Sequence, residues 1–164
     1  MKQAPPAPAE ALVAWRWLRW QEFSPDLLYQ MLRLRSAVFV VEQWCVFPDM
    51  DGCDPRCEHL LGCGADGRVL ACARLLPPGL KYAEPSLGRI VTAPEARRSG
   101  LGRALMREAL AGCRLRYPGP IRIGAQQRLE RFYAEFGFAT VSAPYLEDDI
   151  WHVDMLQAAS VNAA

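Results

Sequence analysis

One segment constrains the fold of this chain more than any other, because an apolar run, an arginine- and glycine-rich turn and a helical pattern follow in close succession. The apolar run is Leu87–Val91, the turn is Arg97-Arg98-Ser99-Gly100-Leu101-Gly102, and the helical pattern runs from Gly100 to about Tyr117. Glycines let the main chain approach a ligand, free N–H groups at a helix N-terminus bind anions, and arginines add charge-assisted contacts. The segment therefore predicts a strand–turn–helix unit that binds phosphate.

The apolar periodicity elsewhere extends this unit into a single α/β domain. The Trp-rich run 13–20 predicts a first strand, and Ser24-Pro25-Asp26 predicts the start of a helix that runs to about Glu42. Further strands are expected at 60–65, 69–76, 87–92, 121–125, 138–141 and 150–156, with a short helix over 129–136. The order β-α-β-β-β-α-β-α-β-β predicts an α/β (α+β) fold, a mixed twisted central sheet flanked by helices. It covers 13–157, between a disordered leader (1–12) and a flexible tail (158–164).

Composition argues against several functional classes. The net charge of +1 gives no general attraction to nucleic acid or to a membrane surface, and no apolar run approaches the length that spans a bilayer. The Pro/Ala-rich start lacks the apolar core of a signal peptide, so we expect a cytoplasmic protein with no nucleic-acid or membrane partner. The six cysteines are expected to be free thiols. Cys53, Cys57 and His59 lack a paired C-x-x-C, so no metal is predicted.

Two motifs match a pattern by letter but not by context. Gly62–Gly67 spells G-x-G-x-x-G, yet its last glycine falls in a predicted hairpin turn and a strand follows, where a dinucleotide site needs a helix. Asp49–Asp54 resembles a calcium loop, but its glycine is at the fourth position and Leu60 stands where the closing glutamate belongs. Neither motif supports a ligand site.

A second informative group is Phe132-Tyr133-Ala-Glu-Phe-Gly137-Phe138, which by itself is typical of an aromatic helix face that ends at a glycine. It lies about thirty residues after R-x-x-G-x-G, with one predicted strand between the two motifs. Together they resemble motifs A and B of the GNAT acetyltransferases, and the order of elements is similar to that family's.

The resemblance is closest to the ElaA-like branch of this family. It is carried by Leu34–Gln43, Asp49–Asp54 with His59, Gly88–Val91, Gly124–Gln126 and Tyr145–His152, within residues 27–155. It implies a sheet whose strands splay to form a slot for acetyl-CoA. It also implies transfer of the acetyl group to an amine, either a small molecule or a peptide, by a monomer or homodimer.

The resemblance further implies a site in three parts. Acetyl-CoA would be held by Ile90, Val91, Arg97, Arg98, Ser99, Gly100, Leu101, Gly102, Arg103, Gln126 and Phe132. Tyr133 would be the general acid that reprotonates the departing thiolate, since phenol and thiol pKa values are close enough for proton transfer. Glu42, His59 and His152 are candidates for the base. The residues expected to meet the substrate are Asp51, Asp54, Glu147 and His152.

Two departures from the family pattern affect this assignment. Gln126 stands where GNAT proteins often have an asparagine that contacts the pantetheine arm. Leu87–Val91 lacks the carboxylate that many relatives use as a base on the strand before the phosphate turn. The base is therefore expected on another element, or to be water.

Acids concentrate in two loops. Five of them lie between residues 42 and 58 against the single base Arg56, and Glu147-Asp148-Asp149 forms a second acidic run. If they face the acetyl end of the slot, they favour a cationic substrate such as a polyamine, an aminoglycoside or a lysine side chain. The alternative is that both are solvated loops.

Two other functions remain open at this point. Arg35, Phe39, Trp44, Asp51, Asp54 and Arg74–Pro77 resemble the front half of acyl-homoserine-lactone synthases. Those enzymes share a GNAT-like fold, take the acyl group from an acyl carrier protein and typically lack the R-x-x-G-x-G turn. The other alternative is a GNAT fold that acts without catalysis, as an acetyl-CoA sensor or an interaction module.

Overall fold

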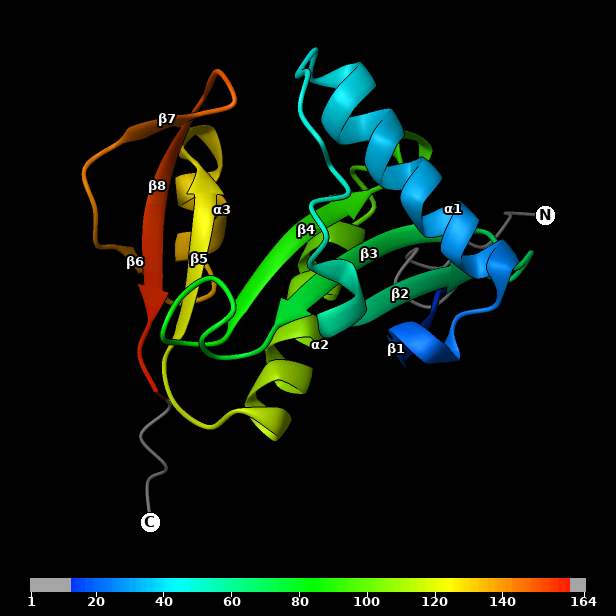
Figure 1. Cartoon of the computed structure of the whole chain (residues 1–164), viewed down its shortest axis with the longest axis horizontal. Coiled ribbons are helices and arrows are strands. Elements are labelled where there is room, and N and C mark those ends of the chain that lie inside the picture. The colour runs from blue at the N-terminus through cyan, green and yellow to red at the C-terminus, as the bar shows by residue number, and fades with distance from the viewer. Residues whose placement is uncertain (1–12, 160–164) are drawn as a thin grey trace, which may run out of the picture.

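An eight-stranded mixed sheet organises the chain in a computed structural model, which describes residues 13–159 (Figure 1). The strands are β1 (Val13–Arg19), β2 (Glu58–Gly64), β3 (Val69–Leu76), β4 (Ser86–Thr92), β5 (Ile121–Gln126), β6 (Phe138–Thr140), β7 (Tyr145–Glu147) and β8 (Ile150–Gln157). Their order is β1-β2-β3-β4-β5-β8-β6, and β7 pairs with β8. The predicted leader, and residues 160–164 of the predicted tail, lie outside the described residues.

Every strand predicted from the sequence is present, and each starts and ends within two residues of the expected place. The sequence missed β7, which has only three residues and lies next to a polar turn. The N-terminal helix also differs from the prediction. It is α-helical over α1 (Pro25–Arg35) and continues as a π-helical segment over Ser36–Glu42. Apolar spacing does not separate these two helical forms over so short a run.

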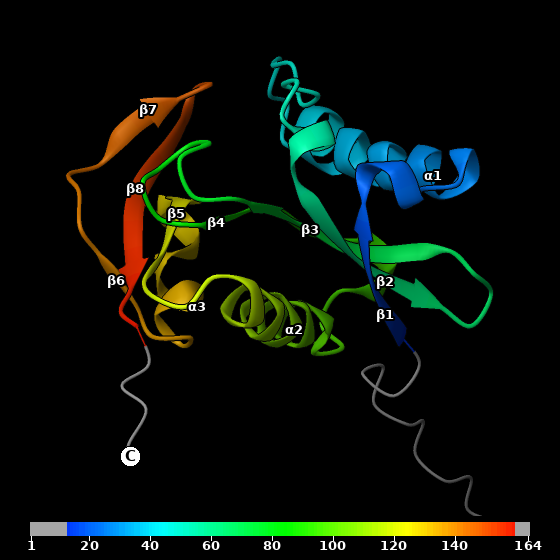
Figure 2. The same ribbon diagram turned by 60° about the horizontal axis from the view of Figure 1, so that its bottom comes forward.

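Helices cover both faces of the sheet (Figure 2). α1 lies on one face, where Met31, Leu34 and Val38 join a core cluster with strands β2 and β3. α2 (Leu101–Arg116) and α3 (Glu130–Ala134) lie on the other face and enclose the larger core cluster. The predicted N-cap is confirmed, because the Ser24 hydroxyl accepts a hydrogen bond from the Leu27 N–H at 3.2 Å.

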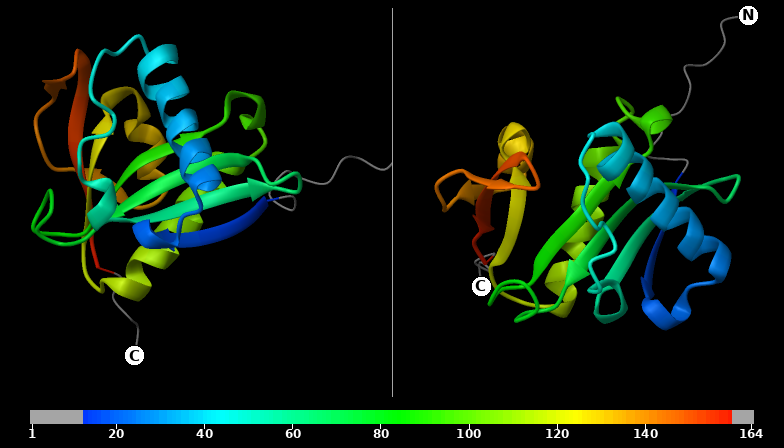
Figure 3. Two further views of the ribbon diagram at one scale, coloured as in Figure 1. Left: turned by 45° about the vertical axis from the view of Figure 1, so that its right-hand side comes forward. Right: turned by 45° about the horizontal axis from the view of Figure 1, so that its top comes forward.

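The sheet opens between β4 and β5, the only parallel neighbours among the described strands. These two strands share a single paired position, Ser86 with Arg122, whereas β5 pairs with β8 at six positions. Beyond that pair the strands diverge, so β1–β4 and the β5, β8, β6 group form two leaves (Figure 3). The predicted splayed sheet is therefore confirmed, and the divergence creates the space for a site.

The helix after the phosphate turn packs as its spacing predicts. Leu101, Leu105, Ala109 and Cys113 are all buried against the sheet. Gly112 lies next to them, and an added Cβ there would overlap the Trp17 indole. α2 thus approaches β1 closely because this position has no side chain.

Candidate active site

A cavity of about 930 Å³ lies where β4 and β5 part, and both leaves of the sheet contribute to its wall. Its volume is in the range of ligand and cofactor sites. Nine of the residues expected at a site line it: Glu42, Asp51, Ile90, Val91, Arg97, Gln126, Tyr133, Glu147 and His152. Residues separated by more than 100 positions in the sequence thus meet in one cleft.

The phosphate turn, residues 97–102, follows β4 at the edge of this cavity and exposes its main chain. Arg98 (φ +63°) and Gly100 (φ +89°) have left-handed backbone conformations just before α2 begins at Leu101. Between residues 13 and 159, the N–H groups of Ser99, Gly100, Leu101 and Gly102 have no acceptor within the protein. An added Cβ at Gly102 would meet nothing within 4 Å. Converging free N–H groups at a helix N-terminus are the donor set that a diphosphate needs.

The arginines of this turn differ in whether a carboxylate already binds them. Arg97 donates to both oxygens of Glu42, each at 2.9 Å, and Arg103 donates to both oxygens of Glu135, at 2.8 and 3.0 Å. Arg98 is exposed and has no ion pair among the described residues. A phosphate group would therefore find Arg98 free, and would compete with Glu42 for Arg97.

The predicted acid, Tyr133, projects from α3 into the cavity and is 7% exposed. Its ring contacts Phe132 and Phe138 edge-on, with centroids 5.3 and 6.3 Å apart, so the aromatic helix face both packs and orients it. No residue of the described chain hydrogen-bonds to its hydroxyl. Burial raises the pKa of Tyr133 to about 12, so the phenol keeps its proton at neutral pH and is able to donate it.

Gln126 joins the two walls of the cleft. Its Nε2 donates to Gln43 Oε1 at 3.0 Å, and its Oε1 accepts from Arg128 Nε at 2.9 Å. Gln43 directly follows the π-helical segment, whereas Gln126 ends β5. The Gln126 amide therefore links β5 to the segment after the π-helical residues, across the cleft. This is a position from which a side chain can contact a ligand that enters the cleft.

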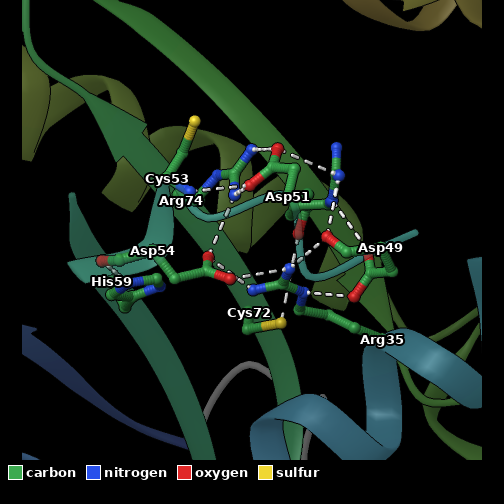
Figure 4. Close-up of polar contacts among 9 residues, drawn as sticks. Arg35, Asp49, Asp51, Cys53, Asp54, His59, Cys72 and Arg74 are labelled. Carbon is green, nitrogen blue, oxygen red and sulfur yellow. Dashed lines mark hydrogen bonds and ion pairs between the residues drawn. The ribbon is translucent and has the colours of Figure 1, made fainter. Parts of the chain in front are cut away.

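Sequence analysis missed an ion-pair network that borders the cavity (Figure 4). Arg35 reaches Asp49 Oδ2 at 2.9 Å and Asp54 Oδ1 at 2.7 Å, and Arg74 Nη2 reaches Asp51 Oδ2 at 2.7 Å. Its six members are Arg35, Arg74, Arg89, Asp49, Asp51 and Asp54. Three positive and three negative charges balance, and they fasten the loop after the π-helical segment to α1, β3 and β4.

This network overturns the expectation that the 49–54 loop attracts a cationic substrate, since its carboxylates are already paired. Asp54 is 4% exposed and does not line the cavity. Burial alone would raise its pKa, but hydrogen bonds and charge from Arg35 and Arg74 outweigh burial and hold the pKa below its usual range. Of the two predicted substrate residues in this loop, only Asp51 lines the cavity.

His59 is not placed to act as the base. The side chain is 1% exposed, does not line the cavity, and its Nε2 lies 3.1 Å from the Asp54 carbonyl oxygen. Burial lowers the pKa of this imidazole, and its contacts with Trp20 and Phe23 are those of a packed core residue. The contact of His59 with the Asp54 carbonyl oxygen therefore indicates a structural role for this histidine and not a catalytic one.

The second acidic run behaves differently from the first. Glu147 and Asp148 line the cavity, and in residues 13–159 neither carboxylate pairs with an arginine or a lysine. They lie at the β7–β8 hairpin, opposite the loop that carries Cys45, whose thiol donates to the Asp148 carbonyl oxygen at 3.1 Å. This hairpin therefore supplies uncompensated negative charge to the rim of the cleft.

The cysteines and the helices add two negative findings. All six cysteines are free thiols, and no group of three His, Cys, Asp or Glu side chains in the described chain is arranged to hold a metal ion. Among residues 13–159, no helix has the length and apolar character needed to cross a bilayer.

Known proteins resemble this chain in sequence and in structure. Residues 58–158 match the family model described as an acetyltransferase (GNAT) domain. A UPF0039 protein of Synechocystis sp. is 40% identical over 88% of this chain and 94% of its own length. Protein ElaA of Escherichia coli is 37% identical over 88% and 95%. An acyl-CoA N-acyltransferase of Pseudomonas aeruginosa superposes with a TM-score of 0.84 at 37% identity, covering 89% of this chain and 99% of that one.

A more distant structure corrects one expectation. The lactone synthase BjaI superposes with a TM-score of 0.74 at 18% identity, over 91% of this chain and 84% of its own, and is described as CoA-dependent with isopentyl-CoA bound. The expectation that lactone synthases take the acyl group from an acyl carrier protein is therefore wrong for BjaI, and use of coenzyme A does not by itself distinguish acetyltransferases from lactone synthases. The family model and the close relatives nevertheless agree, and the chain belongs to the GNAT acetyltransferase family.

Proposed function

We propose that this protein transfers the acetyl group of acetyl-CoA to an amine. The observation that carries the proposal is the row of free N–H groups at 99–102, which follows directly on the turn residue Arg97 in the wall of the cleft that also contains the unbonded hydroxyl of Tyr133. A diphosphate on the turn and a thioester near the tyrosine are the two ends of one extended ligand. Between them lie Val91 and Gln126, which line the cavity and offer main-chain and amide groups to a pantetheine arm.

The residues of the cleft would divide the chemistry between them. The turn and Arg98 hold the diphosphate, and the narrow gap between β4 and β5 orients the thioester. Holding both reactants in place contributes several kcal/mol to catalysis. Tyr133, protonated because burial raises its pKa to about 12, supplies a proton to the leaving sulfur.

The acceptor is proposed to be a cationic amine, small or peptidic. Glu147 and Asp148 are the carboxylates that support this, because they line the cleft and, among the described residues, neither pairs with an arginine or a lysine. Unpaired carboxylates at the rim raise the local concentration of an ammonium group. A panel of acceptors in which anionic or neutral amines react best would contradict this part of the proposal.

The alternative of a lactone synthase has less support than the resemblance suggested. Four of the residues that carried it, Arg35, Asp51, Asp54 and Arg74, belong to the closed ion-pair network. Their shared role in fastening a loop accounts for the similarity without lactone chemistry. Formation of a lactone from S-adenosylmethionine and an acyl-CoA by the purified protein would reverse this ranking.

Calorimetry with acetyl-CoA tests the proposed cofactor site. Gly102→Trp is expected to abolish binding, because the indole would fill the approach to the free N–H groups. The protein should still fold, since a Cβ at this position meets nothing within 4 Å. Ala111→Trp is the matched control, as it adds the same side chain to an exposed position of the same helix and should leave binding intact. Equal affinity of wild type and Gly102→Trp would refute the site, and absence of binding to wild type would withdraw the function.

A further inference from the structure

We infer that His152 is the general base of this site, taking a proton from the ammonium form of the acceptor. The inference rests on the proposed acetyl transfer. It supplies the general base that the strand Leu87–Val91 lacks. His152 lies on β8 and lines the cavity, with 13% of its side chain exposed. It is thus reachable from the cleft and shielded from bulk water.

The position of His152 on the sheet places it on the side from which an acceptor would approach. Its register partner is Gln126, so the two side chains project from neighbouring strands on the same face. The alternate residues Val153 and Met155 point to the opposite face, into the core cluster that also contains Tyr133. Tyr133 and His152 therefore reach the same cavity from opposite faces of the β5–β8 pair.

The hydrogen bonds of the imidazole assign its tautomer. Nδ1 lies 2.8 Å from the Ile150 carbonyl oxygen. Because a carbonyl only accepts, Nδ1 must carry the hydrogen and donate it. In the neutral ring Nε2 then has the lone pair, and its nearest carboxylate oxygen, Oε2 of Glu147, is 4.0 Å away. The fold thus fixes the ring with its basic nitrogen unoccupied.

The groups around the ring favour an acceptor cation and leave Nε2 free. β7 contributes Glu147 and Tyr145, whose ring stacks on the imidazole with centroids 6.0 Å apart. The hairpin turn contributes Asp148, and β5 contributes the uncharged Gln126. Among the described residues, no arginine or lysine pairs with Glu147, Asp148 or His152, and Arg128 reaches this group only through the side-chain oxygen of Gln126, at 2.9 Å.

The other bases proposed from the sequence, and Asp51, are engaged by arginines or lie outside the cavity. Both oxygens of Glu42 accept from Arg97, at 2.9 Å. Both oxygens of Asp51 accept from Arg74, at 2.8 and 2.7 Å. His59 is buried outside the cavity. His152 is the remaining candidate from the sequence that lines the cleft with a free basic atom.

In the proposed reaction, His152 accepts one proton and Tyr133 donates another. Nε2 takes one proton from the ammonium, and the nitrogen lone pair forms the new C–N bond to the acetyl carbon. The C–S bond breaks with its electron pair on sulfur, which receives the Tyr133 hydroxyl proton. The amide nitrogen loses its second proton through solvent, which restores the tyrosine, and the imidazolium returns its proton to water. The products are one amide, one free thiol and one released proton.

Two measurements on the untagged protein test this assignment. His152→Gln keeps a polar side chain of similar reach but has no basic nitrogen, so kcat/KM should fall by about 10²-fold and lose its acidic limb. Affinity for acetyl-CoA should not change. Glu42→Gln is the comparison variant and should retain the acidic limb. If the acidic limb persists in His152→Gln, or disappears in Glu42→Gln, the assignment is refuted.

Nuclear magnetic resonance of the wild-type protein keeps the test decisive even if His152→Gln does not fold. The chain has two histidines, and His59 is the buried one, so the imidazole ¹⁵N signals are readily assigned. We expect His152 to show the Nδ1–H tautomer, as its hydrogen bond to the Ile150 carbonyl oxygen requires. A protonated Nε2 in the neutral ring would overturn the inference. Absence of acetyl transfer to any amine would instead refute the proposed function.

Discussion

Removal of Asp54 should destabilise the protein strongly, because this carboxylate holds two buried arginines. It accepts from Arg35 Nη1 at 2.7 Å, from Arg35 Nη2 at 3.2 Å and from Arg74 Nη1 at 3.0 Å. The three side chains are 5%, 1% and 4% exposed, so water cannot replace the lost contacts. Breaking a buried pair by deleting one partner typically costs about 3–5 kcal/mol. The second carboxylates, Asp49 and Asp51, remain, so we expect Asp54→Ala to fall at the lower end of that range.

Urea unfolding followed by tryptophan fluorescence measures this loss, with the free energy taken from the midpoint at a common slope. Asp66→Ala is the matched control. Asp66 also pairs with an arginine, Arg68 at 2.6 Å, but both side chains are more than half exposed, so its removal should leave the midpoint almost unchanged. A loss below about 1 kcal/mol for Asp54→Ala would refute the view that the network fastens the loop beside the cleft.

Further predictions concern the acid, the packing of α2 and the response to pH. Tyr133→Phe should lower kcat by about 10²-fold while calorimetry finds unchanged acetyl-CoA affinity; wild-type turnover would remove Tyr133 as the acid. Gly112→Leu should lower the thermal midpoint by several degrees, because its side chain would overlap Trp17, and an unchanged melt would contradict this contact. Hydrogen bonds to arginine outweigh burial and hold the pKa values of Asp51 and Asp54 low. Their contribution to stability is therefore complete above the ordinary aspartate pKa of about 3.9 and is lost as pH falls below it. Urea midpoints that do not fall between pH 5 and 3 would refute this.

Local sequence determined most of the fold and one part of the site. Strands and helices follow from apolar spacing over short windows, and the phosphate turn follows from adjacent glycines and arginines. Neither depends on distant contacts, which is why the predicted strands and the starts of the helices agree with the structure within two residues. Tyr133 was proposed through the resemblance of Phe132–Phe138 to motif B of the GNAT family, and the structure places it in the cleft.

Tertiary structure alone decided which charged residues are available for chemistry. Arg35, Arg74 and Arg89 meet their aspartates across 14 to 40 positions of the chain, and such pairing has no local signature. This pairing neutralises the carboxylates of the 49–54 loop and attaches the loop to α1, β3 and β4. The same applies to His152, whose tautomer depends on how β8 presents the Ile150 carbonyl and whose exposure depends on the divergence of β4 from β5. Periodicity encodes which residues become buried, but the pairing of charges depends on three-dimensional proximity, which only the folded chain provides.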